Sequence, residues 1–143
     1  MTMRETVHEF LEALNQREFE KVMGYFAADS RVDAGPWFDQ PLVGKVAVRS
    51  FLENFLHSLP GLKVNATGVF ASRDDAVVTV EVRATMSQLN PDPVHIEEWR
   101  GGRKLVWNGA FVISFTADRK MHGFRIFGDS SDLRWVPRES PTA

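Results

Sequence analysis

The spacing of apolar residues changes once along this chain, and that change constrains the fold more than any other feature. Before Pro60 the apolar residues recur at intervals of three and four, which is typical of helices with one buried face. After Gly61 they alternate with polar residues, which is typical of half-buried strands. Helices followed by a run of strands predict an α+β domain, in which the helices cover one face of a sheet.

Three helices are expected before Pro60. Thr2 and Glu5 have the spacing of a capping box, so the first helix should begin after Thr2. A second, short helix should run from near Phe19 to the polar residues at 29–30, and a third from Gly44 to Pro60. The apolar stripe of the third helix consists of Val48, Phe51, Leu52, Phe55 and Leu56.

The remaining elements follow from the same patterns. A brief strand is expected at 31–33, followed by a loop at GPWFDQP, whose prolines and glycine exclude regular structure. Further strands are expected near 62–66, 78–82, 104–116 and 120–129. A length of 143 residues suits one domain, which we place at 1–136, with a frayed tail at 137–143.

Composition excludes several classes of function. The net charge is -2 and the basic residues are dispersed, so we expect no nucleic-acid partner. The absence of cysteine excludes disulfides, thiolate nucleophiles and cysteine-ligated zinc. No apolar run is long enough to cross a bilayer or to form a signal peptide, so we expect no membrane association and a cytoplasmic location.

Two stretches carry a family resemblance. Gly102 to Asp129 resembles the last two strands of the ketosteroid isomerases, in its GRK turn, its F-x-x-x-F rhythm and its closing FGD. EFLEALNQREFEKVMGYFAADSRVDAG is similar to that family's first two helices and first strand. The resemblance implies the NTF2-like cone shared by ketosteroid isomerases and SnoaL-like polyketide cyclases. Three helices would then pack on a curved, mainly antiparallel sheet that encloses a pocket, and the protein would form a homodimer.

The same resemblance shows which catalytic groups are missing. Ketosteroid isomerases use an aspartate base, with a tyrosine and a protonated aspartate that hold the enolate oxygen. Carried over, the tyrosine falls on Phe10, the base on Ala34 and the second aspartate on Phe111. A lost base costs about 10² to 10⁴ in rate and a lost oxyanion donor about 10² to 10³, so we expect no true ketosteroid isomerase.

The catalytic residues of two related enzyme types are also absent from this sequence. The Arg-x-Asp pair and the last-strand aspartate of limonene epoxide hydrolases fall on Glu81, Arg83 and Ile126. SnoaL-type cyclases carry an acid directly after an aromatic residue on the last strand, and here Phe124 is followed by Arg125.

The pocket implied by the resemblance is apolar. Its expected ligand-binding residues are Phe10, Ala34, Trp37, Val80, Trp99, Trp107, Phe111 and Phe124, with Val78, Val82 and Ile113 beside them. Such a cavity suits a flat, hydrophobic ligand. The alternative is that these residues only form the core that any sheet of this kind needs.

Four residues are candidate acids or bases. Asp33 would turn inward if a bulge near Pro36 shifted the register, and Asp39 lies in the loop that follows. His95 belongs to a long insertion at 89–102 that could act as a lid, and His122 has the strand parity of Phe124. Each of the four could equally be a solvated surface residue.

These observations leave two small-molecule functions open, beside a third reading in which the exposed sheet is a protein docking or dimer surface. One is a cofactor-independent cyclase, isomerase or dehydratase acting on a hydrophobic cyclic small molecule by acid-base chemistry. The other is a module that binds such a molecule without converting it. Neither requires a cofactor, and we expect no metal site, because His95 and Glu97 have no evident third ligand.

Overall fold

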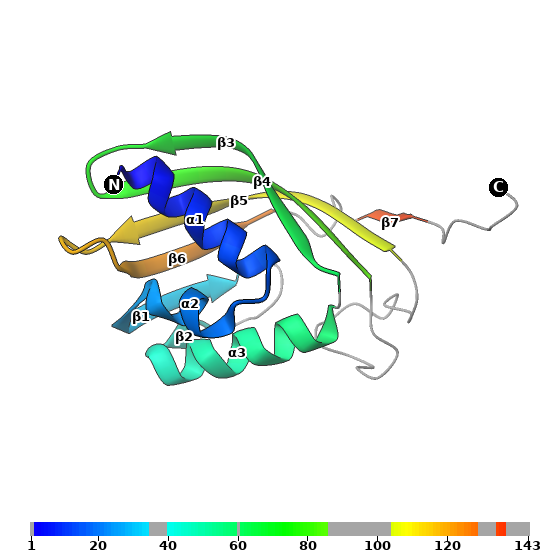
Figure 1. The fold of residues 1–143 in the computed structure, drawn as a ribbon, viewed down its shortest axis with the longest axis horizontal. Coiled ribbons are helices and arrows are strands. Elements are labelled where there is room, and N and C mark those ends of the chain that lie inside the picture. The colour runs from blue at the N-terminus through cyan, green and yellow to red at the C-terminus, as the bar shows by residue number, and fades with distance from the viewer. Residues whose placement is uncertain (1, 35–39, 60, 86–103, 129–133, 137–143) are drawn as a thin grey trace, which may run out of the picture.

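The computed structural model describes residues 2–34, 40–59, 61–85, 104–128 and 134–136, and it has the α+β architecture expected from the sequence. Three helices lie on one side of a curved sheet (Figure 1). The elements in chain order are α1 (Met3–Asn15), α2 (Phe19–Gly24), β1 (Phe26–Ala34), β2 (Leu42–Val43), α3 (Lys45–Ser58), β3 (Lys63–Ala71), β4 (Asp75–Thr85), β5 (Lys104–Phe115), β6 (Met121–Phe127) and β7 (Arg134–Val136).

The sheet is mainly antiparallel, as expected. Its strand order is β2-β1-β6-β5-β4-β3, and β7 pairs with β5 off this path. Only the β1–β6 pairing is parallel among those described. Because β1 pairs with β6, the first strand lies beside the last long one, and the N-terminal helices are carried across the inner face of the sheet.

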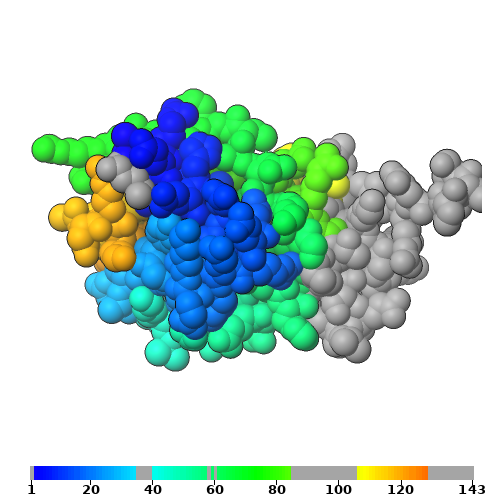
Figure 2. Space-filling view, in the orientation of Figure 1, coloured from blue at the N-terminus to red at the C-terminus, as the bar shows by residue number. Residues whose placement is uncertain are grey.

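The first helix begins where the sequence predicts. The hydroxyl of Thr2 accepts a hydrogen bond from the Glu5 amide at 3.1 Å, which satisfies one of the free N–H groups of the first turn. The apolar residues at intervals of three and four, Val7, Phe10, Leu11 and Leu14, are all buried. In the space-filling view α1 and α2 cover the sheet from this side (Figure 2).

The predicted second helix is too long. It ends at Gly24, and β1 begins at Phe26 instead of Arg31. The physical reason is strand pairing, because the Tyr25 carbonyl accepts a hydrogen bond from the Met121 amide at 2.7 Å. Lys120 donates from Nζ to the Gly24 carbonyl at 2.7 Å. These bonds draw the chain onto the edge of β6 and end the helix there.

Two side chains at the C-terminal end of α1 and just after it, Asn15 and Arg17, hold the helical layer to the sheet. Asn15 donates from its amide nitrogen to the Val64 carbonyl at 2.9 Å, and its amide oxygen accepts from the Val64 N–H at 2.7 Å. Arg17 donates to the carbonyls of Leu56 and Leu59, at 2.6 Å and 2.5 Å. This Asn15–Arg17 clamp therefore fixes α1 to the edge strand β3 and to the end of α3.

No helix in the described ranges is long and apolar enough to cross a membrane. The tail expected at 137–143 lies outside the described residues.

The clamp predicts a specific loss of stability. Asn15→Ala should lower the free energy of unfolding by about 1–3 kcal/mol, because the part-buried N–H and C=O of Val64 lose their partner. The matched control is Gln16→Ala, whose side chain only reaches Glu12 at the surface, and it should change stability by less than about 0.5 kcal/mol. Urea unfolding midpoints at unchanged slope measure both. Equal effects of the two substitutions would contradict the clamp.

Candidate functional site

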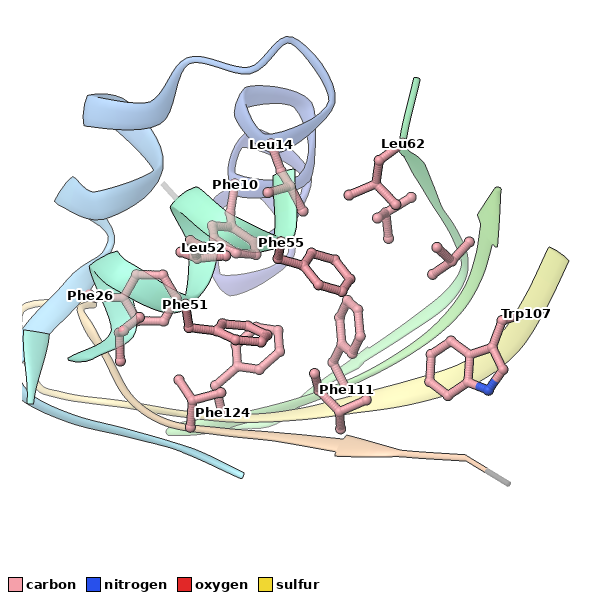
Figure 3. A pocket seen from close by; sticks show the side chains of 15 residues that line it. Phe10, Leu14, Phe26, Phe51, Leu52, Phe55, Leu62, Trp107, Phe111 and Phe124 are labelled. Carbon is pink, nitrogen blue, oxygen red and sulfur yellow. The ribbon is translucent and has the colours of Figure 1, made fainter. Parts of the chain in front are cut away.

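The candidate site is an apolar cavity of about 70 Å³ between the helices and the inner face of the sheet. Its walls come from α1 and α3 and from strands β1, β3, β4, β5 and β6 of the sheet (Figure 3). The described residues that line it are Phe10, Leu14, Phe26, Val32, Val48, Phe51, Leu52, Phe55, Leu62, Val64, Val82, Trp107, Phe111, Phe124 and Ile126.

Aromatic rings in mutual contact make the floor. The rings of Phe111 and Phe124 are tilted to each other with centroids 4.9 Å apart, and Phe10 packs on Phe124 at 5.9 Å. Phe26 meets Phe10 edge-on at 5.9 Å. Such geometries add about 0.5–1.5 kcal/mol per pair beyond area burial, so this side of the cavity is rigidly packed.

The opposite wall comes from α3 and is less deeply buried. Phe51 and Phe55, one turn apart on the helix, stack with ring centroids 5.4 Å apart. Both are only partly buried, whereas Val48 and Leu52 on the same helix are buried. Among the aromatic rings of the described lining, these two are therefore the most accessible to solvent.

The chemistry of the lining is almost entirely that of carbon. Apart from the indole nitrogen of Trp107, the side chains of the described lining residues contain no nitrogen or oxygen (Figure 3). The same part of the chain gathers no group of three or more histidine, aspartate and glutamate side chains that could hold a metal ion. These walls can select a ligand by shape and hydrophobicity, but they supply no acid or base.

The expected ligand-binding residues divide into three groups. Phe10, Trp107, Phe111 and Phe124 line the cavity. Ala34 and Val80 are buried in the surrounding core, each 2% exposed, but lie outside the lining, as do the neighbouring Val78 and Ile113. Trp37 and Trp99 lie outside the described residues, together with the candidate acid Asp39 and the candidate base His95.

Asp33 points away from the cavity. Along the end of β1 the buried residues are Val32 and Ala34, and Val32 lines the cavity, so Asp33 belongs to the other face. There its carboxylate accepts a hydrogen bond from Nε of Arg31 at 3.2 Å. The inward register considered for Asp33 is therefore not the one observed.

His122 also points away, and a β-bulge is the cause. Ser114 pairs with Gly123 but Phe115 pairs with Met121, so His122 is an extra residue in β6. The extra residue reverses the alternation, and Met121 and Phe124 are both buried while His122 is exposed. Its Nε2 lies 3.4 Å from Asp29 at the surface. The parity of His122 with Phe124, on which its candidacy rested, is not observed.

The structure also shows where the catalytic positions of the two related enzyme types lie. Glu81 accepts a hydrogen bond from Nε of Arg83 at 2.7 Å, and neither lines the cavity. Arg125 is exposed and its guanidinium lies 4.9 Å from the centre of the Phe127 ring. Ile126 does line the cavity, so the last-strand position carries a hydrocarbon side chain there.

Sequence reasoning missed the whole α3 wall. The stripe of Val48, Phe51, Leu52 and Phe55 was recognised as the buried face of a helix, but it was not assigned to the pocket. The available signal was the cluster of aromatic residues in that stripe. Leu14, Phe26, Val32, Leu62, Val64 and Ile126 were missed as well, since they are ordinary core residues in the sequence.

Comparison with known proteins agrees with the fold. The model of the SnoaL-like domain matches residues 7–122. The sequence matches none of the curated proteins.

Solved structures of similar fold include an epoxide hydrolase/cyclase-like enzyme, SalBIII, involved in pyran ring formation in the polyether salinomycin. It is 15% identical with a TM-score of 0.77, covering 94% of this chain and 95% of that one. A proposed polyketide cyclase from Xanthomonas campestris pv. campestris is 15% identical with a TM-score of 0.77, covering 90% and 91%. A computationally designed 17-OHP binder is 14% identical with a TM-score of 0.73, covering 91% and 95%. At these identities the likeness concerns the fold.

Tyr25, the only tyrosine in the chain, stands behind the cavity wall. Its ring meets Phe10 edge-on at 5.8 Å, and its hydroxyl donates to Oε2 of Glu9 at 3.1 Å. Burial of the phenol raises the pKa of Tyr25 above its ordinary value of 10.0, and the hydrogen bond and negative charge of Glu9 raise it further. Tyr25 therefore remains a neutral donor to Glu9.

This assignment predicts the titration of a single group. Because no other tyrosine is present, tyrosinate absorbance should report Tyr25 alone, with a midpoint above 10.0 that falls in Glu9→Gln. The folded state favours the protonated phenol of Tyr25. The contribution of Tyr25 to the free energy of unfolding is therefore fully present below the pKa that Tyr25 has in the unfolded chain, and it is lost as pH rises through the pKa that Tyr25 has in the folded protein. Tyr25→Phe should remove that alkaline loss, and a wild-type midpoint at or below 10.0 would contradict the assignment.

Proposed function

The chain belongs to the SnoaL-like domain family, and on that basis we propose that it binds a hydrophobic small molecule in the cavity between α1, α3 and the sheet. The observation that carries this proposal is the hydrocarbon lining of the cavity. Protein interiors are normally packed to the density of organic crystals, so a carbon-lined space of about 70 Å³ costs stability unless something occupies it.

The size of the cavity limits the ligand. Pockets for drug-sized ligands typically measure about 300–1,000 Å³, well above the volume found here. The portion of a ligand that enters the cavity can therefore contain at most one or two rings, and even these require modest displacement of side chains. Phe51 and Phe55 are the rings that would move, because they are the aromatic rings of the described lining that are only partly buried.

The proposed binding function predicts the effect of filling the cavity. Phe111→Trp should fill the cavity from its floor and weaken the binding of an apolar probe such as 2-naphthol by about tenfold or more. The matched control is Phe70→Trp, because Phe70 is 65% exposed on β3 and does not line the cavity. Titration of 2-naphthol by fluorescence measures both. Equal affinities of Phe111→Trp and wild type would contradict binding at this site.

A second candidate function is conversion of the ligand, by a cyclase, isomerase or dehydratase reaction that uses no cofactor. Two structures of similar fold, SalBIII and the polyketide cyclase candidate, are described as enzymes of this kind. The designed 17-OHP binder, also of similar fold, instead matches the binding function proposed first. Acid-base catalysis requires a group within hydrogen-bond reach of the ligand. The described lining offers none, and Asp33 and His122 face away from it. Of the four candidate acids and bases, Asp39 and His95 are then the two on which conversion would depend.

This candidate is tested by removing those two groups. Asp39→Asn and His95→Gln keep the size of each side chain but remove its acid-base function, and one of them should lower turnover by about 10² to 10⁴. Binding of 2-naphthol should change little, because affinity comes from the apolar walls. Asp33→Asn serves as the control and should keep full turnover. Product formation that survives the double substitution would rule out this assignment.

We also propose that the protein is a homodimer, formed through the sheet face opposite the helices. Phe70, Val77 and Phe127 are 65%, 38% and 44% exposed, and Phe70 is the cross-strand neighbour of Val77. Sedimentation velocity should give the mass of a dimer, and Phe127→Glu should give that of a monomer. Val46→Glu on α3, where Val46 is 82% exposed, should remain dimeric. A wild-type monomer at high concentration would refute the proposal.

A further inference from the structure

The indole of Trp107 occupies the space that two missing side chains would fill. A Cβ atom built on Gly109 would lie 2.2 Å from Cη2 of Trp107, and one built on Gly128 would lie 2.1 Å from Cζ2. Real Cβ contacts essentially never fall below 3.0 Å. With any other residue at either position, the indole could not remain where it is.

The register of the sheet explains why the two glycines are adjacent. In the antiparallel β5–β6 pairing Ala110 lies opposite Phe127, so the next pair in the same register is Gly109 with Gly128. Trp107 and Gly109 are two residues apart on β5 and therefore project to the same face, the one that bears the cavity. Together the two glycines leave a depression beneath the indole on that face.

Backbone conformation does not explain these glycines. Among the glycines that the structure describes, only Gly44 and Gly61 have a positive φ, so Gly109 and Gly128 adopt angles open to any residue. Gly123 on β6 is different, because a Cβ there would meet the Ser114 side chain at an ordinary 3.6 Å. The contact with Trp107 is therefore the steric reason for glycine at 128, and at 109 it adds to a contact with the Phe127 carbonyl oxygen.

We propose that Gly109 and Gly128 form a seat for the indole of Trp107, and that this glycine seat sets the length of the cavity. The indole is 2% exposed and forms the wall at the end of the cavity furthest from Phe26 (Figure 3). A side chain in the seat would push the indole away from the sheet and into the cavity, shortening it. The seated indole thus selects ligands by length. This inference rests on the proposed binding function.

The test compares one-ring and two-ring probes, phenol and 2-naphthol, by titration calorimetry. The size preference is the dissociation constant of phenol divided by that of 2-naphthol. Gly128→Ala should lower it about tenfold, because the displaced indole excludes the second ring. Trp107→Leu should raise it, and Gly123→Ala should leave it unchanged. Gly128 is preferred to Gly109 because a Cβ at 109 would also lie 2.7 Å from the Phe127 carbonyl, a clash independent of the indole.

A double substitution decides whether the indole carries the effect. In Trp107→Leu the seat is empty, so adding Gly128→Ala should change the size preference by less than about twofold. An equal loss in both backgrounds would overturn the proposal. If Gly128→Ala alone fails to fold, the double variant should fold, since the clash is gone. Failure of both to fold would also overturn it.

A ligand-free measurement separates the seat from the binding function. A protein with Trp107 as its only tryptophan is obtained by replacing Trp37, Trp99 and Trp135 with phenylalanine. Its near-ultraviolet circular dichroism should change in Gly128→Ala and not in Gly123→Ala. Absence of probe binding to wild type would refute the proposed function while this spectrum still tests the seat. An unchanged spectrum in Gly128→Ala would refute the seat itself.

Discussion

The cavity depends on the polar Asn15–Arg17 clamp. Apolar walls tend to collapse onto one another, because a void forfeits dispersion contacts on every side. Here α1 is held by hydrogen bonds from Asn15 to Val64 and from Arg17 to Leu56 and Leu59. These bonds satisfy backbone groups at a strand edge and a helix end, so the clamp cannot move without leaving them unpaired. It therefore fixes the spacing between helix and sheet in which the cavity lies.

The walls of the cavity determine what kind of recognition is possible. A hydrocarbon lining offers a ligand no directional hydrogen bond, so affinity follows contact area and fit. Two polar side chains beside lining residues are already engaged, Tyr25 with Glu9 and Asp33 with Arg31. Shape then becomes the main source of specificity. The aromatic floor fixes one side, the stacked and partly buried Phe51 and Phe55 form another, and Trp107 forms the end.

The sequence was sufficient for the inward residues of β5 and for the buried face of α1. Alternation placed Trp107 and Phe111 inward, and helical spacing placed Phe10 inward, because burial of one face is what these patterns encode. It was insufficient for His122, because a single extra residue reverses the alternation and leaves no mark in the pattern. It also could not separate Val82, which lines the cavity, from Val80, which packs in the core. That difference depends on where the helices lie above the sheet, which is a tertiary property.

If the hydrocarbon cavity is the ligand site, nuclear Overhauser effects should connect bound 2-naphthol with methyl groups that line it. Contacts are expected to Leu52, Val82 and Ile126, which line the cavity from α3, β4 and β6. Contacts confined to Val43 and Val46, which are 63% and 82% exposed and lie outside the cavity, would contradict it.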